Sequence, residues 1–326
     1  LQIRGRGDAF YNSNIINKNS NILNSFDPLD YAVKLGHALG LKIHVWMNCY
    51  MLWSSNLYPT DTSHILYSNP DWMESDIYGK SDSRIDLNSM QSPSWEGIFI
   101  SPMHQEVNQY LREVAKEVYE KYDIDGLHLD YIRYQDEYYG FHPDGRKEFS
   151  LLFDVDPLDI ARGIISTRYG WEQAYVDSIH LEWKEFKQDK VTELLEYINE
   201  DIGSLNRKIV VSAAVKPNLM EAQTRWHQNW KDWIDRGLLD FVVPMNYSKE
   251  VIDFMTNIKI IKSNINANDL DRIIMGIAVY NQDSDAVIDK IFLSRLNGIK
   301  GVSLFSYDYH KNNLEWFTPI IKSMLE

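Results

Sequence analysis

The sequence predicts an α/β protein that folds as a (β/α)8 TIM barrel. Two observations lead to this fold class. Short β-rich runs alternate with helical patterns along the 326 residues, and such repetition implies a parallel sheet with right-handed crossovers. No glycine-rich phosphate turn follows a predicted strand, which disfavours an open doubly wound sheet, the second candidate. Because barrels of this class often exceed about 250 residues, we expect residues 1–326 to form one domain.

Seven strands are predicted, at 1–7, 41–48, 124–132, 207–215, 238–247, 272–280 and 299–308. A barrel needs one more strand, and we expect it upstream of Leu1, because the chain opens directly in a strand-like run. Counted with this missing first strand, the third and fourth strands are followed by the long insertions 49–103 and 133–180. A barrel places its active-site loops at these carboxyl ends.

Helices are predicted between the strands, at 27–40, 104–122, 181–202, 228–237 and 284–298. The first has Asp27 as its N-cap, Pro28 at the first helical position and Gly40 as a stop signal. The next two show apolar residues at three-to-four spacing. The asparagine-rich tract at 11–25 is most simply a solvated loop.

Charge and composition exclude several partners. The net charge is −14 and no basic run exists, so nucleic acid and anionic membranes are poor partners. One cysteine excludes an intrachain disulfide, and the histidines lack metal-ligand spacing, so we predict no cofactor and no metal. No segment reaches the length of a transmembrane helix, and no signal peptide is visible. The aromatic content of 13% fits either rings that stack on sugars or large apolar cores.

Asp130 is the most informative residue. In the run "DIDGLHLDYIRYQ" at 123–135, Leu127 and Leu129 point one way and His128 and Asp130 the other. An isolated carboxylate facing a core is costly, so Asp130 is either paired within the scaffold or functional in a cleft. Because it ends its strand, we favour function. Asp125 begins the same strand, where a turn or capping role is the better interpretation.

Other polar residues are expected on inward faces or at strand ends, although barrel interiors prefer Val, Ile and Leu. Some of these residues have a structural interpretation beside the functional one. Arg4 and Arg6 could each form an ion pair with a neighbouring carboxylate. His44 and His128 could be hydrogen-bonded histidines of the core. The predicted substrate-binding residues are Arg6, His44, Trp46, Asn48, His128, Arg133, Asn246, Tyr247, Tyr280 and Tyr307.

Carboxylates and aromatic rings at one opening suit glycoside hydrolysis. Asp130 would be the nucleophile or charge stabiliser, with Asp308 and Asp8 as leading proton donors and Glu221 behind them. No G-x-S-x-G elbow or H-x-E…C-x-x-C deaminase pattern offers another chemistry. Possible sugar platforms are Trp46, Trp53, Tyr58, Tyr134, Tyr247 and Tyr307.

Several phrases in order, "RGRGDAFY", "DPLDYAVKLGHALGLKIHVWMN", "YDIDGLHLDYIRY", "DWIDRGLLDFVVPMNY", "IIMGIAVY" and "GVSLFSYD", resemble the glycosyl hydrolase-like 10 family. The likeness runs from Leu1 to about Asp308. It implies a bacterial (β/α)8 barrel, related to the domain that cleaves partly deacetylated poly-N-acetylglucosamine. Members are typically exported or lipid-anchored, which implies an extracytoplasmic or cell-envelope location. The family often has paired aspartates where this chain has Asp130 and Tyr131.

A looser likeness to the family-18 chitinase motif lacks the glutamate that acts as the acid in that motif. Asp125, Gly126 and Asp130 fit D-G-x-D-x-D-x-E, but His128 and Ile132 replace an aspartate and the glutamate. We therefore predict a glycosidase that cuts O-glycosyl bonds in a bacterial or dietary polysaccharide, with amino sugars as one candidate component. The alternative is a glycan-binding barrel that has lost its proton donor. A hydrolase of another bond, such as an amide on an amino sugar, is a third candidate.

Overall fold

A computed structural model describes residues 1–89 and 95–325 of the chain. The contacts divide it into two compact units. The first consists of Leu1–Val211 and Thr224–Gln228, and the second of Ser212–Gln223 and the residues from Asn229 onward. That the whole chain is one domain stays a prediction.

The sheet of the first unit is parallel. Its strands are β1 (Gln2–Arg4), β2 (His44–Asn48) and β5 (Gly126–Asp130), in the order β1-β2-β5. The beginning of β6 (Val210–Val215) continues this sheet, because the Val210 N–H donates to the Asp125 carbonyl at 3.0 Å. The predicted alternation is confirmed: the side chains of Val45, Met47, Leu127 and Leu129 are fully buried and form the core face.

The helices of the first unit lie between its strands in the chain and within its long insertions. They are α1 (Pro28–Ala38), α2 (Ile65–Ser68), α3 (Val107–Lys121), α4 (Pro143–Phe153), α5 (Pro157–Ala161) and α6 (Gln173–Gly203). The cap predicted for the first helix is confirmed, because the Asp27 carboxylate accepts the N–H groups of Leu29 and Asp30. Helix α3 buries Val107, Leu111, Val114 and Val118 at helical spacing.

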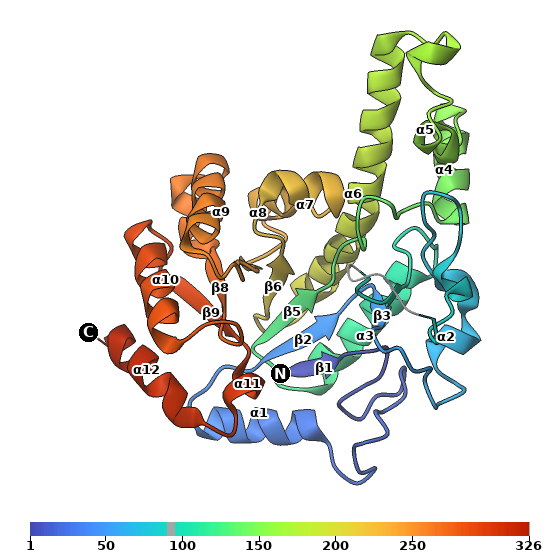
Figure 1. Ribbon diagram of the computed structural model, residues 1–326. Helices are drawn as coiled ribbons and strands as arrows, with labels where there is room; N and C mark the ends of the chain where they lie inside the picture. Colours follow the sequence, from blue (N-terminus) through green and yellow to red (C-terminus); the bar gives the residue numbers. More distant parts are fainter. Residues whose placement is uncertain (90–94, 326) are drawn as a thin grey trace. The chain divides into compact units, whose positions relative to one another are not determined.

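Helix α6 is longer than predicted. It begins at Gln173 rather than near 181, because Val176 and Ile179 extend its buried stripe toward α4 and α5. Figure 1 shows α4 and α5 beside the N-terminal half of α6, away from the strands. The two long insertions therefore contain structure of their own.

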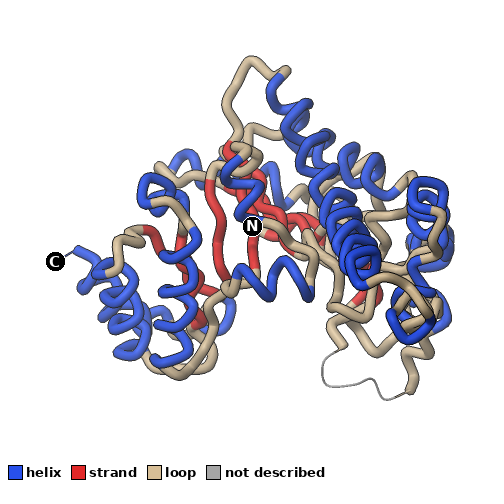
Figure 2. The backbone as a smooth tube through the Cα atoms, turned by 90° about the horizontal axis from the view of Figure 1, so that it is seen from above, coloured by secondary structure: helices blue, strands red, loops and turns tan. Residues whose placement is uncertain are grey.

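The insertion after β2 is mostly loop. It forms a two-stranded antiparallel pair, β3 (Met51–Trp53) and β4 (Ile98–Phe99), with α2 between them in the chain. Figure 2 draws the loops of the chain in tan. This pair was not predicted, since its strands are only three and two residues long. It carries the insertion back to the start of α3.

The second unit repeats the strand–helix alternation. Its strands are the remainder of β6, then β7 (Phe241–Pro244), β8 (Ile274–Ala278) and β9 (Gly301–Phe305). They are parallel neighbours in chain order, with Ser212 opposite Phe241 and Ile274 opposite Gly301. Its helices are α8 (Trp230–Asp235), α9 (Val251–Asn264), α10 (Ser284–Leu296), α11 (Tyr307–His310) and α12 (Thr318–Leu325), while α7 (Leu219–Arg225) spans the boundary between the units.

Every predicted strand has a counterpart, and a parallel α/β fold is confirmed. The predicted ranges are too long, because turns and caps begin inside them. Residues 5–7 form a bend in place of strand, and residues 307–308 begin α11. Closure into a barrel stays a prediction. Within the part of the chain that the structure describes, every helix is too short or too polar to cross a membrane.

Candidate functional site

The carboxyl ends of β2 and β5 bring the predicted polar residues together. In the parallel register His44 lies opposite Gly126, Trp46 opposite His128, and Asn48 opposite Asp130. Because opposite residues of neighbouring strands share a face, these side chains lie on the face away from the aliphatic core. The prediction that the two strands present one polar face is confirmed.

Asp130 occupies the last position of β5. Asp130 is 8% exposed, and its Oδ1 atom accepts the N–H of Tyr131 at 2.7 Å. Tyr131 has a φ of 51°, in the left-handed region that side chains other than glycine seldom adopt. This turn ends the strand at the aspartate. The Asp130 carbonyl accepts the N–H of Cys49 at 2.8 Å, which fixes the ends of β2 and β5 beside each other.

Glu96 is a carboxylate near Asp130 that sequence reasoning missed. Burial, together with the charges of Asp130 and Glu96, raises the pKa of the Tyr131 hydroxyl to about 12. Both carboxylates therefore act on one tyrosine. Glu96 forms an ion pair with Arg133, whose guanidinium lies 4.9 Å from the centre of the Tyr131 ring. The signal was present, because Glu96 follows Trp95 in an insertion predicted to be an active-site loop.

Arg133, a predicted substrate-binding residue, is 2% exposed. Besides the ion pair with Glu96, it donates to the carbonyl of Tyr134 at 3.1 Å. These contacts favour a role in positioning Glu96 and the Tyr131 ring.

The other polar residues of β2 and β5 have different surroundings. Asn48 is 2% exposed; it donates to the Gly5 carbonyl at 2.9 Å and accepts the indole N–H of Trp46 at 2.9 Å. It therefore orients Trp46. Burial, together with the charge of the neighbouring His44, lowers the pKa of His128 to about 4, so His128 is neutral at pH 7. A neutral imidazole can donate one hydrogen bond and accept another.

The loop after β1 carries Asp8 and Arg6. Asp8 accepts the N–H of Arg6 at 3.0 Å and a hydrogen bond from the Asn19 amide. The Arg6 guanidinium donates to the Ser54 hydroxyl at 3.0 Å and lies 5.7 Å from the centre of the Trp53 ring. Arg6 and Trp53 together form a flat, partly exposed surface.

Arg4 has backbone partners in place of the carboxylate that its structural interpretation predicted. Within the described residues the fully buried guanidinium donates to the carbonyls of Asn48 and Cys49, the latter at 3.1 Å, and forms no carboxylate ion pair. These carbonyls at the end of β2 accept only from Nη1, while the buried Nε and Nη2 atoms have no hydrogen-bond partner among the described residues.

The predicted aromatic residues of the second unit gather at the ends of its own strands. Tyr247, after β7, stacks on Phe305 with ring centres 5.5 Å apart, and Tyr280, after β8, meets both rings edge-on at 6.3 Å. Tyr280 is 40% exposed. The unit therefore offers an aromatic surface at its strand ends.

The remaining predicted residues of this unit are less uniform. Asn246 is buried and bonds to the Phe254 carbonyl at 3.0 Å and to Asn257 at 2.9 Å, so both ends of its amide are held by α9. Tyr307 and Asp308 are exposed on α11. Glu221, on α7, accepts from Asn218 at 3.2 Å.

A second cluster of titratable side chains, Glu74, Lys187 and His227, is buried in the first unit. Glu74 accepts from the Ser75 N–H and the Ser101 hydroxyl, each at 2.8 Å, and burial raises its pKa to about 7. Burial lowers the pKa of Lys187 to about 7, although the charge of Glu74 opposes this. His227 lies nearby with both ring nitrogens buried and without a partner within the described residues. None of these was predicted, since they come from three distant segments.

No group of three or more His, Cys, Asp or Glu side chains that could hold a metal occurs among residues 1–89 and 95–325.

Known proteins share this sequence and fold. The chain is 22% identical over 236 residues to the glycosyl hydrolase DigH of Escherichia coli, covering 68% of this chain and 46% of that protein. It is 23% identical over 273 residues to the glycosyl hydrolase YngK of Bacillus subtilis, covering 76% of this chain and 45% of that protein. The chain thus spans about half the length of these curated relatives.

Solved structures show the same α/β fold at low identity. The glycoside hydrolase domain of PgaB (BpsB) from Bordetella bronchiseptica superimposes with a TM-score of 0.68 at 14% identity, covering 98% of this chain and 86% of that one. An α-L-fucosidase isoenzyme from Paenibacillus thiaminolyticus gives a TM-score of 0.57 at 12% identity, covering 99% and 42%.

The model of one protein family, glycosyl hydrolase-like 10, matches residues 1–294. This match includes the ends of β2 and β5 and the aromatic ends of β7 and β8, and it supports a glycosidase-type function. It confirms the resemblance seen in the ordered sequence phrases. The chain belongs to the glycosyl hydrolase-like 10 family.

Proposed function

We propose that the chain is a glycosidase that hydrolyses O-glycosyl bonds in a polysaccharide, with Asp130 as its working carboxylate. The observation that carries this proposal is the position of Asp130. It ends a buried parallel strand, on the polar face that it shares with Trp46 and His128. In α/β folds of this kind the carboxyl ends of strands carry the catalytic groups.

The chemistry follows from the charge that glycoside cleavage creates. The transition state resembles an oxocarbenium ion, and a carboxylate beside it stabilises the positive charge or attacks the anomeric carbon. The left-handed Tyr131 turn holds the Asp130 carboxylate at the strand end. Trp46, whose indole is oriented by Asn48, supplies an apolar ring for a sugar face. Neutral His128 is suited to bond a sugar hydroxyl.

A second carboxyl must transfer the proton, and we propose Asp308 or Asp8 for this role. Glu96 is already paired with Arg133, so we assign it to positioning Arg133 and the Tyr131 ring. The distance between the two working carboxyl groups would fix the stereochemistry. About 5 Å predicts retention of configuration, and about 6.5–9.5 Å predicts inversion.

The substrate class and location rest on the family resemblance. We propose a bacterial or dietary polysaccharide that contains amino sugars, and an extracytoplasmic or envelope location. The exposed aromatic side chains at the strand ends, Tyr280 and Tyr307 among them, support a polymeric carbohydrate because rings of this kind stack on sugar faces.

The decisive experiment is Asp130→Asn, assayed by release of reducing ends from amino-sugar polysaccharides. We expect turnover to fall by on the order of a thousandfold or more, because the amide cannot carry the charge. Asp30→Asn is the matched control, since Asp30 is a half-exposed helix residue paired with Lys34, and it should remain fully active. Far-UV circular dichroism should show both variants folded. An active Asp130→Asn enzyme contradicts the proposal.

The second candidate function is a glycan-binding protein without hydrolysis. It is favoured by the engagement of two acidic side chains, because Asp8 is held by Arg6 and Asn19 and Glu96 by Arg133. Isothermal titration with oligosaccharides beside the reducing-end assay separates the two functions. Binding without any turnover of any amino-sugar polymer would favour this candidate.

A further inference from the structure

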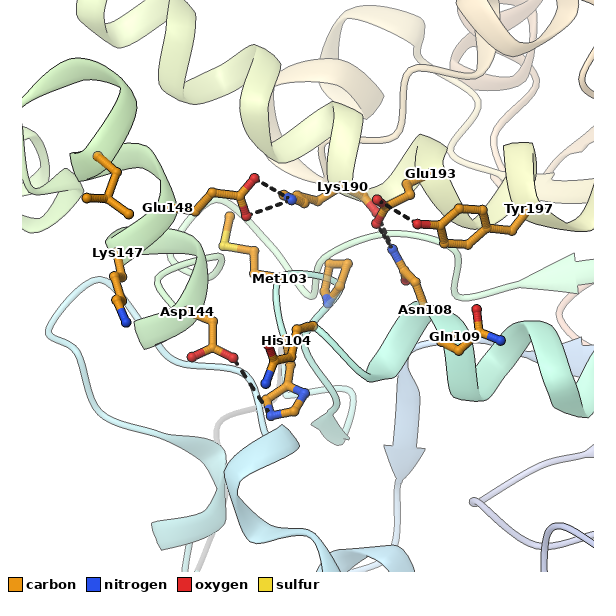
Figure 3. Close-up of a pocket in the computed structure, with 13 residues that line it drawn as sticks. Met103, His104, Asn108, Gln109, Asp144, Lys147, Glu148, Lys190, Glu193 and Tyr197 are labelled. Carbon is orange, nitrogen blue, oxygen red and sulfur yellow. Dashed lines mark hydrogen bonds and ion pairs between the residues drawn. The ribbon is translucent and has the colours of Figure 1, made fainter.

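We propose that a pocket between α3, α4 and α6 is a second saccharide-binding site, which holds a neutral sugar unit of the polymer away from Asp130. The ligand class rests on the proposed function. The pocket has a volume of 510 Å³, within the range of small-molecule sites. Its walls come from the start of α3, one face of α4 and the part of α6 that carries Lys190, Glu193 and Tyr197 (Figure 3). Asp130 is not among the residues that line it.

The floor of the pocket is apolar and its walls are polar. Buried Pro102 and Met103 provide the apolar floor, and Leu151, which is 79% exposed, adds apolar surface at the rim. Figure 3 shows Met103 between the polar side chains of the two walls. A pyranose ring has the same division, with C–H groups on its faces and hydroxyl groups around its edge. Such a ring buries its faces on the floor while its hydroxyls reach the walls.

The walls are held in place before any ligand binds. Glu148 contacts the Lys190 ammonium through both carboxylate oxygens, at 2.8 and 2.7 Å. Glu193 accepts from Asn108 at 2.9 Å and from the Tyr197 hydroxyl at 3.0 Å. Asn108 is itself 3% exposed and donates to the Lys190 carbonyl at 2.8 Å. Pre-organised groups bind more tightly, because less side-chain freedom is lost on association.

The charges of the walls favour a neutral ligand. Three carboxylates, Asp144, Glu148 and Glu193, face the pocket together with the ammonium groups of Lys147 and Lys190. An anionic ligand would meet the carboxylates and a cationic ligand the ammonium groups, and like charges at close range are unfavourable. Sugar hydroxyls both donate and accept hydrogen bonds, so they can satisfy both kinds of group.

Buried hydrogen bonds connect the pocket to the strand-end site. The Oδ1 atom of Asn108 accepts the Tyr50 hydroxyl at 2.8 Å, and the Tyr50 N–H donates to the Tyr131 carbonyl at 3.2 Å. Tyr131 is the residue that follows Asp130. One wall of the pocket and the end of β5 are therefore parts of one hydrogen-bonded framework, which suits two sites on one polymer.

The test reads occupancy at the pocket itself. Cys49 is fully buried, so a Gln105→Cys variant has one accessible thiol, at the pocket rim, for an environment-sensitive fluorophore. The probes are short oligomers of N-acetylglucosamine and of glucose, titrated in the Asp130→Asn background so that no probe is hydrolysed. We expect saturable fluorescence changes with at least one neutral oligomer.

Neighbouring leucines provide a matched pair of variants. Leu151→Arg should weaken the affinity of that oligomer at least tenfold, because it places a long charged chain over the floor. Leu152→Arg should change it less than twofold, since Leu152 is similarly exposed, at 65%, but does not line the pocket. Equal effects of the two variants, no fluorescence change with any oligomer, or tighter binding of a sulfated oligosaccharide would each overturn the inference.

Failure of the proposed function gives a different result. If Asp130→Asn retained full hydrolysis, the assignment of Asp130 as the working carboxylate would fall, but the fluorophore would still report saccharide binding at the pocket. If hydrolysis is lost as expected and the fluorophore never responds, only the second site is contradicted.

Discussion

A methyl group added at Gly126 tests the close contact between β2 and β5. A Cβ atom at this position would lie 2.3 Å from Nδ1 and 2.5 Å from Cε1 of His44. Comfortable contacts between heavy atoms need about 3.5 Å, so the imidazole would have to move by about 1 Å. The backbone cannot move away instead, because Gly126 pairs with His44 in the parallel sheet.

Gly126→Ala should therefore lower the free energy of unfolding by about 0.5–4 kcal/mol. Overpacking of this kind costs about 1–3 kcal/mol, and an imidazole forced off its rotamer adds about 0.5–1.5 kcal/mol. The smaller entropy of the unfolded alanine chain offsets about 0.4–1 kcal/mol. Because His44 is also a proposed substrate contact, the displaced ring should raise KM for the polysaccharide.

Urea unfolding followed by tryptophan fluorescence measures the effect, and a double-mutant cycle identifies its cause. With His44→Ala already present, Gly126→Ala should cost less than about 0.5 kcal/mol, because the imidazole is gone. Gly203→Ala is the control, since a Cβ there meets no atom within 4 Å, and it should leave stability equal or slightly higher. A cost for Gly126→Ala that is the same with and without the His44 ring would refute this explanation.

Two further predictions concern pH. Burial lowers the pKa of Lys187 to about 7 from 10.5, so above pH 7 the unfolded chain binds more protons than the folded one and stability rises with pH. Lys187→Met should remove about 2 kcal/mol of that rise between pH 7 and 9, and parallel urea-unfolding curves for the two proteins would contradict it. Burial raises the pKa of the Asp125 carboxyl, but hydrogen bonds from Lys42, the Ile43 N–H and His37 outweigh it and hold that pKa below 3.8. Wild type should therefore lose stability relative to Asp125→Asn as pH falls below about 4, and a constant difference between pH 7 and pH 3 would count against this assignment.

Periodicity was sufficient to predict the parallel strands and the faces of β2 and β5. The alternation of Leu127 and Leu129 with His128 and Asp130 lies within one strand, so no knowledge of distant residues was needed to place the polar face. Strand ends were placed less well, because they depend on local turns. Helix α9 was missed because its run "VIDFMTNIKIIKSN" is rich in β-branched residues, which also suit strands.

The side-chain partners could not be predicted in the same way. Glu96 meets Arg133 only because the β3–β4 pair brings an insertion back to the end of β5. Lys187 reaches Glu74 from the middle of α6, more than a hundred residues away in the chain. Arg4 carried no sign in the sequence that its Nη1 atom would donate to backbone carbonyls in place of a carboxylate. Each of these contacts depends on where long loops fold back, which residue spacing does not encode.

The two aspartates around β5 separate stability from function within one strand. Asp125 precedes the strand and accepts three hydrogen bonds that tie β5 to the segment before β2, so its charge stabilises the scaffold. Asp130 ends the strand at the edge where parallel strands present their functional groups. The same change from aspartate to asparagine should thus have opposite consequences at the two ends. At Asp125 it should lower stability at neutral pH while kcat is kept, and at Asp130 it should abolish kcat while the urea midpoint stays within the range of the Asp30→Asn control. A shared phenotype, in which both variants lose stability and activity together, would mean that Asp130 serves the scaffold as Asp125 does.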